Sequence, residues 1–350
     1  MIKGTTVAIT GIGIVTPSVH SYADCREDVL KNGKILKTIE SIPLPQGQNA
    51  RELRRLSKLV KMAASAADQA LTMSGADRTG MAAGVALTHG STSFLAEFHD
   101  LLFEYGADSA SPAAFSNGVT NAPLSTISTL YKLTSGGITF TGLESSGIEL
   151  LNNAAESVYH NEYASYLAGS AEEYSPIAEK IYQARGWYNG ITPPYLPSCK
   201  SDEYGLTLSE GSAFVVFEKL TESNSARTLA TYTSLESGYS EKDIDLILSG
   251  ASGGPQDSFE LETIMINFEN GKKDVAFTSS VFGNCFALNG VLSVILACKC
   301  IQENRSILPY VQLHPSIKPG YVQCDKVKNV LVTSSSRDGQ ESHCIISALE

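Results

Sequence analysis

A glutamate occupies a turn of the kind at which many enzymes place a nucleophile. The β-branched and aromatic run 138–141 predicts a strand that ends at Gly142, and the apolar spacing from residue 148 onward predicts a helix. The turn residue, Glu144, would stand at the carboxyl end of a sheet, beside the free amides of a helix N-terminus. A helix N-terminus stabilises a carboxylate, which can also cap the amides of Ser146 or Gly147.

Two other side chains, Ser145 and Cys285, could in principle act as the nucleophile of an enzyme. Ser145 lies on the same turn, as in a nucleophile elbow, but the hydrolase pattern needs glycine two places earlier, where Leu143 stands. Cys285 has no histidine near it in the sequence that could activate it. We therefore do not expect an autonomous hydrolase.

Two further features resemble functional motifs only weakly. Gly11 and Gly13 follow a strand-like run, but Thr16 occupies the place of the third glycine of a dinucleotide loop, and no acidic residue follows at the required distance. His89 ends another strand-like run, where a lone histidine is more often a structural hydrogen-bond donor than a catalytic base. No nucleotide cofactor is expected.

Composition and charge limit the classes of partner. The 350 residues carry a net charge of −11, with 43% hydrophobic and 18% charged residues, as in an ordinary globular protein. This balance argues against nucleic acid, against an anionic membrane surface and against a main docking role for an acidic protein. We find no apolar run long enough to span a bilayer and no signal peptide, so we expect a cytoplasmic protein.

The metal-binding residue types are scattered. The chain has 6 histidines without a close pair, and its 7 cysteines are Cys25, Cys199, Cys285, Cys298, Cys300, Cys324 and Cys344. Most of the cysteines lie inside apolar runs, which predicts buried free thiols and no metal site.

Strand-like and helix-like segments alternate along the chain, which predicts an α/β fold with parallel sheets. The expected strands are 7–10, 81–87, 138–141, 162–171, 208–217, 228–235, 243–249, 274–280, 327–332 and 344–349. The expected helices include 22–31, 51–73, 92–105, a small-residue helix over 111–122, 175–182, 258–268 and 285–301. The second half repeats the rhythm of the first. We therefore expect an internal duplication with halves 1–220 and 221–350 and a boundary near 218–227.

At this point the chain resembles the β-ketoacyl synthase family of the thiolase fold over nearly its whole length. The resemblance rests on the order and spacing of five short segments, namely 7–17, 111–112, 143–147, 210–213 and 283–285. It implies a duplicated, α-β-α-β-α layered fold. Members of that family hold an acyl chain on a turn cysteine and decarboxylate a malonyl unit with two histidines and a nearby lysine.

The resemblance implies that these groups are missing here. Glu144 stands at the position of the turn cysteine. The first histidine position is Gly250 and the second is Asn284, the lysine position is Ser279, and Arg337 lies at the position of the family's gate. An amide is no general base near pH 7, and an ionised carboxylate is a poor acyl acceptor. We expect no catalytic residue and no cofactor. The chain resembles a chain length factor, although the best-known ones carry glutamine at the turn.

A chain length factor would form a heterodimer with an active ketosynthase of a type II polyketide or aryl-polyene system. The resemblance implies that Ile138, Thr139, Phe140 and Thr141 pair with the partner chain and that Ala113, Ser116 and Thr120 face the acyl tunnel. Acyl carrier protein would dock mainly on the partner, because both it and this chain are acidic. Glu144 would then cap its helix or pair with a cation of the partner. The alternatives are a thiolase-fold homodimeric scaffold and an atypical condensing enzyme that is active by itself.

Overall fold

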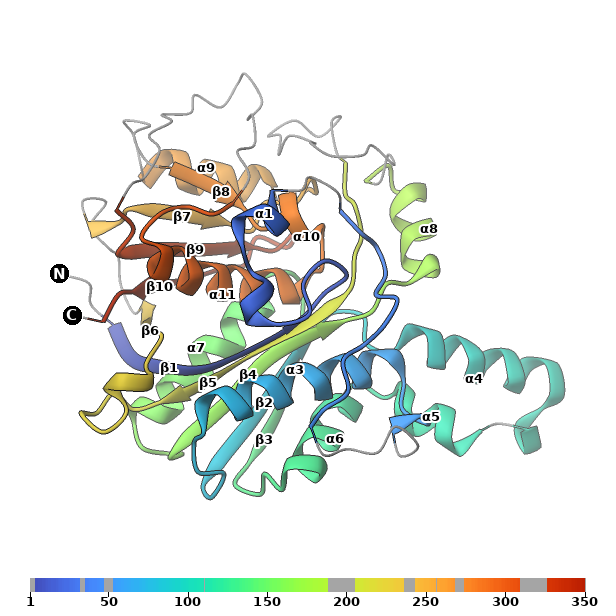
Figure 1. Ribbon diagram of the computed structural model, residues 1–350. Coiled ribbons are helices and arrows are strands. Elements are labelled where there is room, and N and C mark those ends of the chain that lie inside the picture. Colours follow the sequence, from blue (N-terminus) through green and yellow to red (C-terminus); the bar gives the residue numbers. More distant parts are fainter. Residues whose placement is uncertain are drawn as a thin grey trace.

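Ten strands form one mixed sheet within the part of the chain that the computed structural model describes, residues 4–31, 35–46, 53–109, 111–187, 205–235, 243–255, 257–267, 274–308 and 326–349 (Figure 1). The strands are β1 (Gly4–Val15), β2 (Met81–Leu87), β3 (Gly137–Thr141), β4 (Ser165–Glu172), β5 (Gly211–Glu218), β6 (Ala230–Leu235), β7 (Leu246–Ser249), β8 (Asp274–Phe277), β9 (Asn329–Ser335) and β10 (Glu341–Ser347). Their order is β3-β2-β4-β5-β1-β6-β10-β9-β7-β8.

The α-helices are α1 (Glu27–Leu30), α3 (Lys58–Ser74), α4 (Thr92–Tyr105), α5 (Pro112–Gly118), α6 (Ala122–Tyr131), α7 (Ser146–Tyr159), α8 (Pro176–Ala184), α9 (Asp257–Asn267), α10 (Ser279–Phe282) and α11 (Ala287–Glu303). Short 3-10 helices are η1 (Tyr22–Asp24), η2 (Ala107–Ser109) and η3 (Ser225–Arg227). None of the helices in these ranges is both long and apolar enough to cross a membrane.

The pairing of the first five strands repeats in the last five. Strand β2 pairs in parallel with β3 and β4, and β7 pairs in parallel with β8 and β9. The pairs β4–β5 and β5–β1 are antiparallel, as are β9–β10 and β10–β6, and an antiparallel β1–β6 pair joins the two sets. The boundary that we predict at 218–227 falls between β5 and β6, and the duplication stays a prediction. The prediction of parallel sheets is confirmed for the pairs that β2 and β7 form, and it is wrong for β1, β5, β6 and β10, which run against their neighbours.

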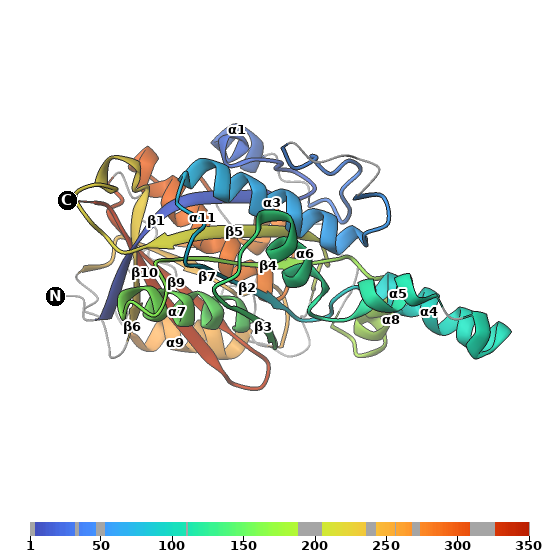
Figure 2. The ribbon, with the colours of Figure 1, turned by 90° about the horizontal axis from the view of Figure 1, so that it is seen from below.

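The layers confirm the predicted α-β-α-β-α architecture. Helices α7 and α11 lie between the two halves of the sheet, α3 covers the outer face of the first half and α9 that of the second (Figures 1 and 2). Both central helices contribute to one hydrophobic core with strands of both halves. A second core lies under α3 and α6, and a small third core under α9. The two central helices are therefore held in place by apolar burial against both halves of the sheet.

Small residues let α3 lie directly on β1. A Cβ added to Gly13 would lie 1.8 Å from the carbonyl oxygen of Ala66, and one added to Gly11 would lie 2.1 Å from that of Ala70. Ser57 caps the helix by accepting a hydrogen bond from the backbone N–H of Val60 at 3.2 Å. The predicted start of this helix at residue 51 is therefore too early, because the cap sets its first turn at Lys58.

The small-residue helix expected over 111–122 is two helices. Ser111 caps α5, which ends at Gly118, and Val119 has extended backbone angles before α6 begins at Ala122. Thr120 therefore lies outside any helix, and the common helical face predicted for Ala113, Ser116 and Thr120 is wrong.

Helices α4 and α5 form an arm that projects from the layers, as both views show (Figures 1 and 2). No residue of α4 is buried, and the arm exposes Phe103, Tyr105 and Phe115 by 85%, 63% and 53%. Strand β3 forms one edge of the sheet, and Ile138 on it is 37% exposed. The arm and this edge therefore expose apolar side chains at the surface of the chain.

Candidate functional site

The turn between β3 and α7 lies under the turn that joins β9 to β10. The backbone N–H of Ser145 donates to Oγ of Ser336 at 2.8 Å, and Oγ of Ser334 donates to the carbonyl of Glu144 at 3.1 Å. A Cβ on Gly147 would lie 1.9 Å from the carbonyl oxygen of Ala287, so the first turns of α7 and α11 touch through their backbones. Two distant parts of the chain thus fix the position of Glu144.

Glu144 forms an ion pair with an arginine of its own chain. Its Oε1 lies 3.2 Å from an Nη of Arg337, and the glutamate is only 5% exposed. The same nitrogen donates to the Tyr182 hydroxyl at 2.9 Å, and the guanidinium lies over the rings of Tyr182 and Trp187, 5.4 and 5.3 Å from their centroids. The contacts hold Arg337 between α8 and the β3–α7 turn.

Burial raises the pKa of the Glu144 carboxyl, while the charge of Arg337 and the backbone amides of Glu144 and Arg337 lower it. Two buried atoms of the pair have no hydrogen-bond partner, Oε2 of Glu144 and Nε of Arg337. The expected cap on Ser146 or Gly147 is wrong, since the helix begins without a side-chain cap and the carboxylate turns to Arg337. The attraction of a buried cation outweighs the cap in this place.

His89 connects this pair to a second buried carboxylate. Its ring lies edge-on to Phe286, with 4.3 Å between the centroids, and its Nε2 lies 3.4 Å from the Tyr182 hydroxyl. Burial and the nearby Arg337 lower the pKa of His89 to about 4, so the ring is neutral at pH 7. Its Nδ1 lies 4.0 Å from Oε2 of Glu172.

Glu172 accepts hydrogen bonds from the backbone amides of Thr88 and His89. Burial raises the pKa of Glu172 to about 8 in spite of these bonds. Both hydrogen bonds come from the backbone of the β2–α4 connection, so the carboxyl is bonded within the protein and is not presented to a substrate. We read it as a structural acceptor, and no sequence pattern singled it out.

The predicted histidine and lysine positions meet in one polar cluster, and none of these positions carries a basic side chain. Oγ of Ser279 donates to the carbonyl of Ala251 at 2.6 Å, and Nδ2 of Asn284 donates to Oγ of Ser252 at 2.9 Å. A Cβ on Gly250 would lie 3.0 Å from Cα of Ser334, next to the residue that binds the Glu144 carbonyl. Gly250, Ser279 and Asn284 therefore lie around the β3–α7 turn, but every polar group among them is already bonded within the protein.

Two buried carboxylates tie this cluster together. Glu260 accepts from the Gly250 amide at 3.0 Å and from hydroxyls of β7 and β9, and Asp257 accepts from the amides of Ser252 and Gly253 at 2.8 and 2.9 Å. Burial raises the pKa of Asp257 to about 7. Each carboxylate serves as an internal acceptor. The sequence analysis missed both, although an acidic pair three residues apart at the start of a helix was a visible signal.

The thiols and the possible metal ligands offer no alternative chemistry. Cys25, Cys285, Cys298, Cys300 and Cys344 are free and buried, as predicted, while Cys199 and Cys324 lie outside the described residues. Burial raises the pKa of the Cys285 thiol far above its ordinary value, which disfavours the nucleophilic thiolate. Within the described ranges no group of histidine, cysteine, aspartate and glutamate could hold a metal ion.

The residues predicted for the tunnel and the interface lie at the surface of this chain. Ala113, Ser116 and Thr120 are exposed on or beside the arm, and β3 presents residues 138–141 at the sheet edge. Oγ1 of Thr139 is buried and has no hydrogen-bond partner. Thr141 ends β3 three residues before Glu144, whereas Ala113 and Ser116 lie on the arm.

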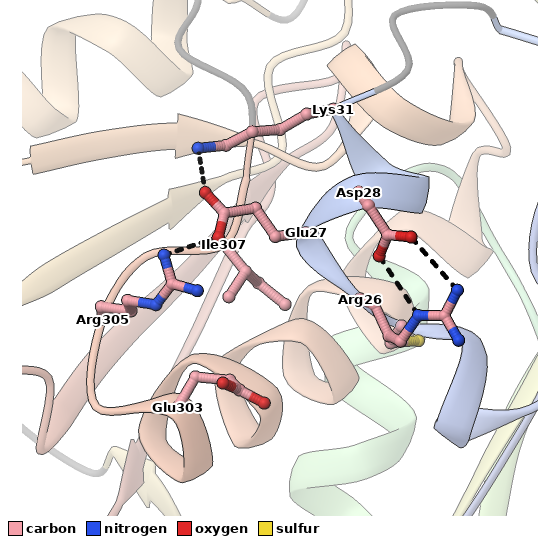
Figure 3. A pocket seen from close by; sticks show the side chains of 8 residues that line it. Arg26, Glu27, Asp28, Lys31, Glu303, Arg305 and Ile307 are labelled. Carbon is pink, nitrogen blue, oxygen red and sulfur yellow. Dashed lines mark hydrogen bonds and ion pairs between the residues drawn. The ribbon is translucent and has the colours of Figure 1, made fainter.

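A cavity of about 540 Å³ lies away from this cluster (Figure 3). Its charged side chains pair with one another, Lys31 and Arg305 with Glu27 at 2.5 Å each and Arg26 with Asp28 at 3.2 Å. None of its lining residues belongs to the predicted site, so the cavity does not change the candidate.

Solved structures with this fold cover nearly the whole chain. The ishigamide ketosynthase/chain length factor matches 99% of this chain and 100% of its own with a TM-score of 0.82 and 17% identity. A β-ketoacyl synthase from Burkholderia phymatum STM815 reaches 0.79 with 16% identity, at 99% and 100% coverage. A type II polyketide synthase acyl carrier protein in complex with its ketosynthase bound to the hexaketide reaches 0.76 with 17% identity, at the same coverage. At these identities the likeness shows the fold.

Sequence comparisons extend this to the family. A curated 3-oxoacyl-[acyl-carrier-protein] synthase 2 of Coxiella burnetii (strain RSA 493 / Nine Mile phase I) is 23% identical over 361 residues, which cover 86% of each chain. The family model "Beta-ketoacyl synthase, N-terminal domain" matches residues 43–223, more than half of the 350 residues. The chain therefore belongs to the β-ketoacyl synthase family.

Proposed function

We propose that this protein is a catalytically silent ketosynthase-like subunit, a chain length factor, that pairs with an active β-ketoacyl synthase of a type II polyketide or aryl-polyene system. The observation that carries the proposal is the ion pair between Glu144 and Arg337 at the turn where the family holds its acyl chain. A nucleophile there would need a free thiol or hydroxyl and a base. This turn offers a paired carboxylate instead.

The rest of the predicted site supports the same conclusion. Glycine, serine and asparagine stand at positions 250, 279 and 284, and none of these side chains takes up a proton near pH 7. His89 is the histidine nearest to the pair among those described, and burial keeps its ring neutral at this pH. Its Nε2 faces the Tyr182 hydroxyl, so it serves packing and not proton transfer.

The surface supports a large interface with another chain. The edge of β3 carries backbone groups that can pair with a partner strand, which would extend the sheet across two subunits. The exposed aromatic residues of the α4–α5 arm add an apolar contact of the kind that obligate interfaces bury. We place the acyl carrier protein mainly on the partner, since the net charge of this chain is −11.

Co-expression tests the proposal. The tagged chain is produced alone and with an untagged candidate ketosynthase, and the complex is then supplied with malonyl-loaded carrier protein. We expect the ketosynthase to co-purify at an equal amount and carrier-bound products to form only in the complex, as read by mass spectrometry. Turnover of malonyl-carrier by this chain alone would favour an atypical condensing enzyme. A stable homodimer that does not bind the ketosynthase would favour the thiolase-fold homodimeric scaffold.

A further inference from the structure

We propose that Glu144 and Arg337 form an internal plug, by which the chain fills its own former acyl site and closes it to thioesters. The inference rests on the proposed loss of acyl transfer, but it does not require a heterodimer. Its basis is the geometry of the β3–α7 turn and of the β9–β10 turn above it. Membership of the β-ketoacyl synthase family does not by itself imply this contact.

The β9–β10 turn is clamped onto the start of α7 at three points. Ser334 bonds the Glu144 carbonyl, Ser336 bonds both the amide and the hydroxyl of Ser145 at 2.8 Å, and Arg337 reaches the Glu144 carboxylate. The first two contacts fix the backbones of the two segments, and the guanidinium lies 3.2 Å from the carboxylate. The turn therefore covers the position at which a substrate carbonyl would approach.

Arg337 is also held from the outer side. Its guanidinium lies against the rings of Tyr182 and Trp187 and donates to the Tyr182 hydroxyl. Tyr182 belongs to α8, so three separate elements meet at one cation. An arginine with free rotation would be a poor barrier, whereas one stacked on two rings keeps its place.

The carboxylate faces the amides that a thioester oxygen would need. The backbone N–H groups of Glu144 and Arg337 both act on the Glu144 carboxylate. One of these N–H groups belongs to the β3–α7 turn and the other to the β9–β10 turn, and N–H groups so placed can stabilise an oxyanion in acyl transfer. A resident carboxylate near them competes with any incoming acyl oxygen.

Stability alone does not explain the pair. It uses a single contact of 3.2 Å and leaves Oε2 of Glu144 and Nε of Arg337 buried without partners, where a bidentate pair would satisfy both. Buried ion pairs contribute little net stability, and apolar residues of similar volume often do as well. Closure of the site gives these two charged residues a purpose that packing does not.

Hydrogen exchange read by mass spectrometry tests the plug in whichever assembly the full chain purifies. The probe is octanoyl-pantetheine, and the peptides are those that cover 141–150 and 333–342. In the wild type we expect slow exchange in both and no change with the probe. In the double variant Glu144→Gly/Arg337→Gly we expect at least about tenfold faster exchange at the β9–β10 turn, and protection of 141–150 by the probe.

Two further variants keep the test decisive if the double variant folds poorly. Glu144→Gln keeps the shape and removes the charge, so exchange at the turn should rise by a smaller factor. Gln340→Ala shortens an exposed side chain of the same turn and should behave as the wild type. Probe protection of the wild type equal to that of the double variant would overturn the plug, as would an opened turn that the probe does not protect. A chain that purifies without a ketosynthase yet excludes the probe refutes only the heterodimer.

Discussion

Replacing Arg337 with methionine should make the stability of the protein fall as the pH rises. The substitution keeps the stem of the side chain but removes the cation that faces Glu144 at 3.2 Å. The carboxylate is then buried without a partner charge, and burial raises its pKa further above the ordinary value of 4.5. Between 4.5 and the raised value the folded state binds a proton that the unfolded state lacks, so stability is lost with increasing pH.

The size of the loss follows from the cost of keeping that proton. Holding a carboxyl protonated above its ordinary pKa costs about 1.4 kcal/mol for each pH unit. For a carboxyl at position 144 that stays protonated, the upper limit is about 3.4 kcal/mol at pH 7 and less than about 1 kcal/mol at pH 5. The side chain of Arg337 is 21% exposed, so water that reaches the altered site will hold the loss at pH 7 below this limit.

Thermal unfolding followed by circular dichroism at pH 5, 6 and 7, at one protein concentration, measures the effect. We expect Arg337→Met to unfold several degrees below the wild type at pH 7 and close to it at pH 5. The matched control Glu144→Gln/Arg337→Met removes the carboxyl but keeps the change near His89, so Arg337→Met should lose more stability than this control between pH 5 and pH 7. An equal loss in Arg337→Met at pH 5 and pH 7 would refute the idea that an unpaired carboxylate is buried there.

Three further outcomes follow from the structure. Glu144→Cys should not restore condensation, because no base stands at the predicted histidine positions; malonyl decarboxylation by the variant chain without an active ketosynthase is the assay, and activity near that of a ketosynthase would contradict us. In the complex, Ser116→Phe should shorten the product read by mass spectrometry while Thr129→Phe on α6 leaves it unchanged; an unaltered length would remove α5 from the tunnel. Gly147→Ala should destabilise by at least about 3 kcal/mol, because its Cβ would lie 1.9 Å from a backbone oxygen, whereas the exposed Asn153→Ala on the same helix should be nearly neutral.

The sequence pattern predicted the bounds of several elements, buried and exposed alike. The strand 81–87 and the helix 92–105 have their predicted bounds, and the strand at 138–141 begins one residue earlier. The sense of strand pairing could not be predicted in this way, because a buried strand reads alike in parallel and antiparallel sheets. The helix expected over 111–122 failed for a local reason: small residues carry no period, so the break after Gly118 left no mark.

The composition of the site was predictable, but its contacts were not. The resemblance placed Glu144 and Arg337 at the turn and the gate, yet nothing in the spacing of two residues 193 positions apart indicates that they touch. Tyr182 and Phe286 were equally hidden, since each lies in a segment whose pattern predicts only packing. Contacts of this kind depend on the tertiary fold, which brings the ends of α7, α8 and the β9–β10 turn together.

The α4–α5 arm has a consequence for the amount of this protein in a cell. In a copy without a partner, solvent contacts a helix with no buried residue, the Phe103 side chain, which is 85% exposed, and an open sheet edge. Such surfaces recruit chaperones, proteases and other unpaired strands. If a partner subunit covers the arm, as we propose, copies in excess of that partner would be cleared, and the level of the chain would follow the amount of the partner.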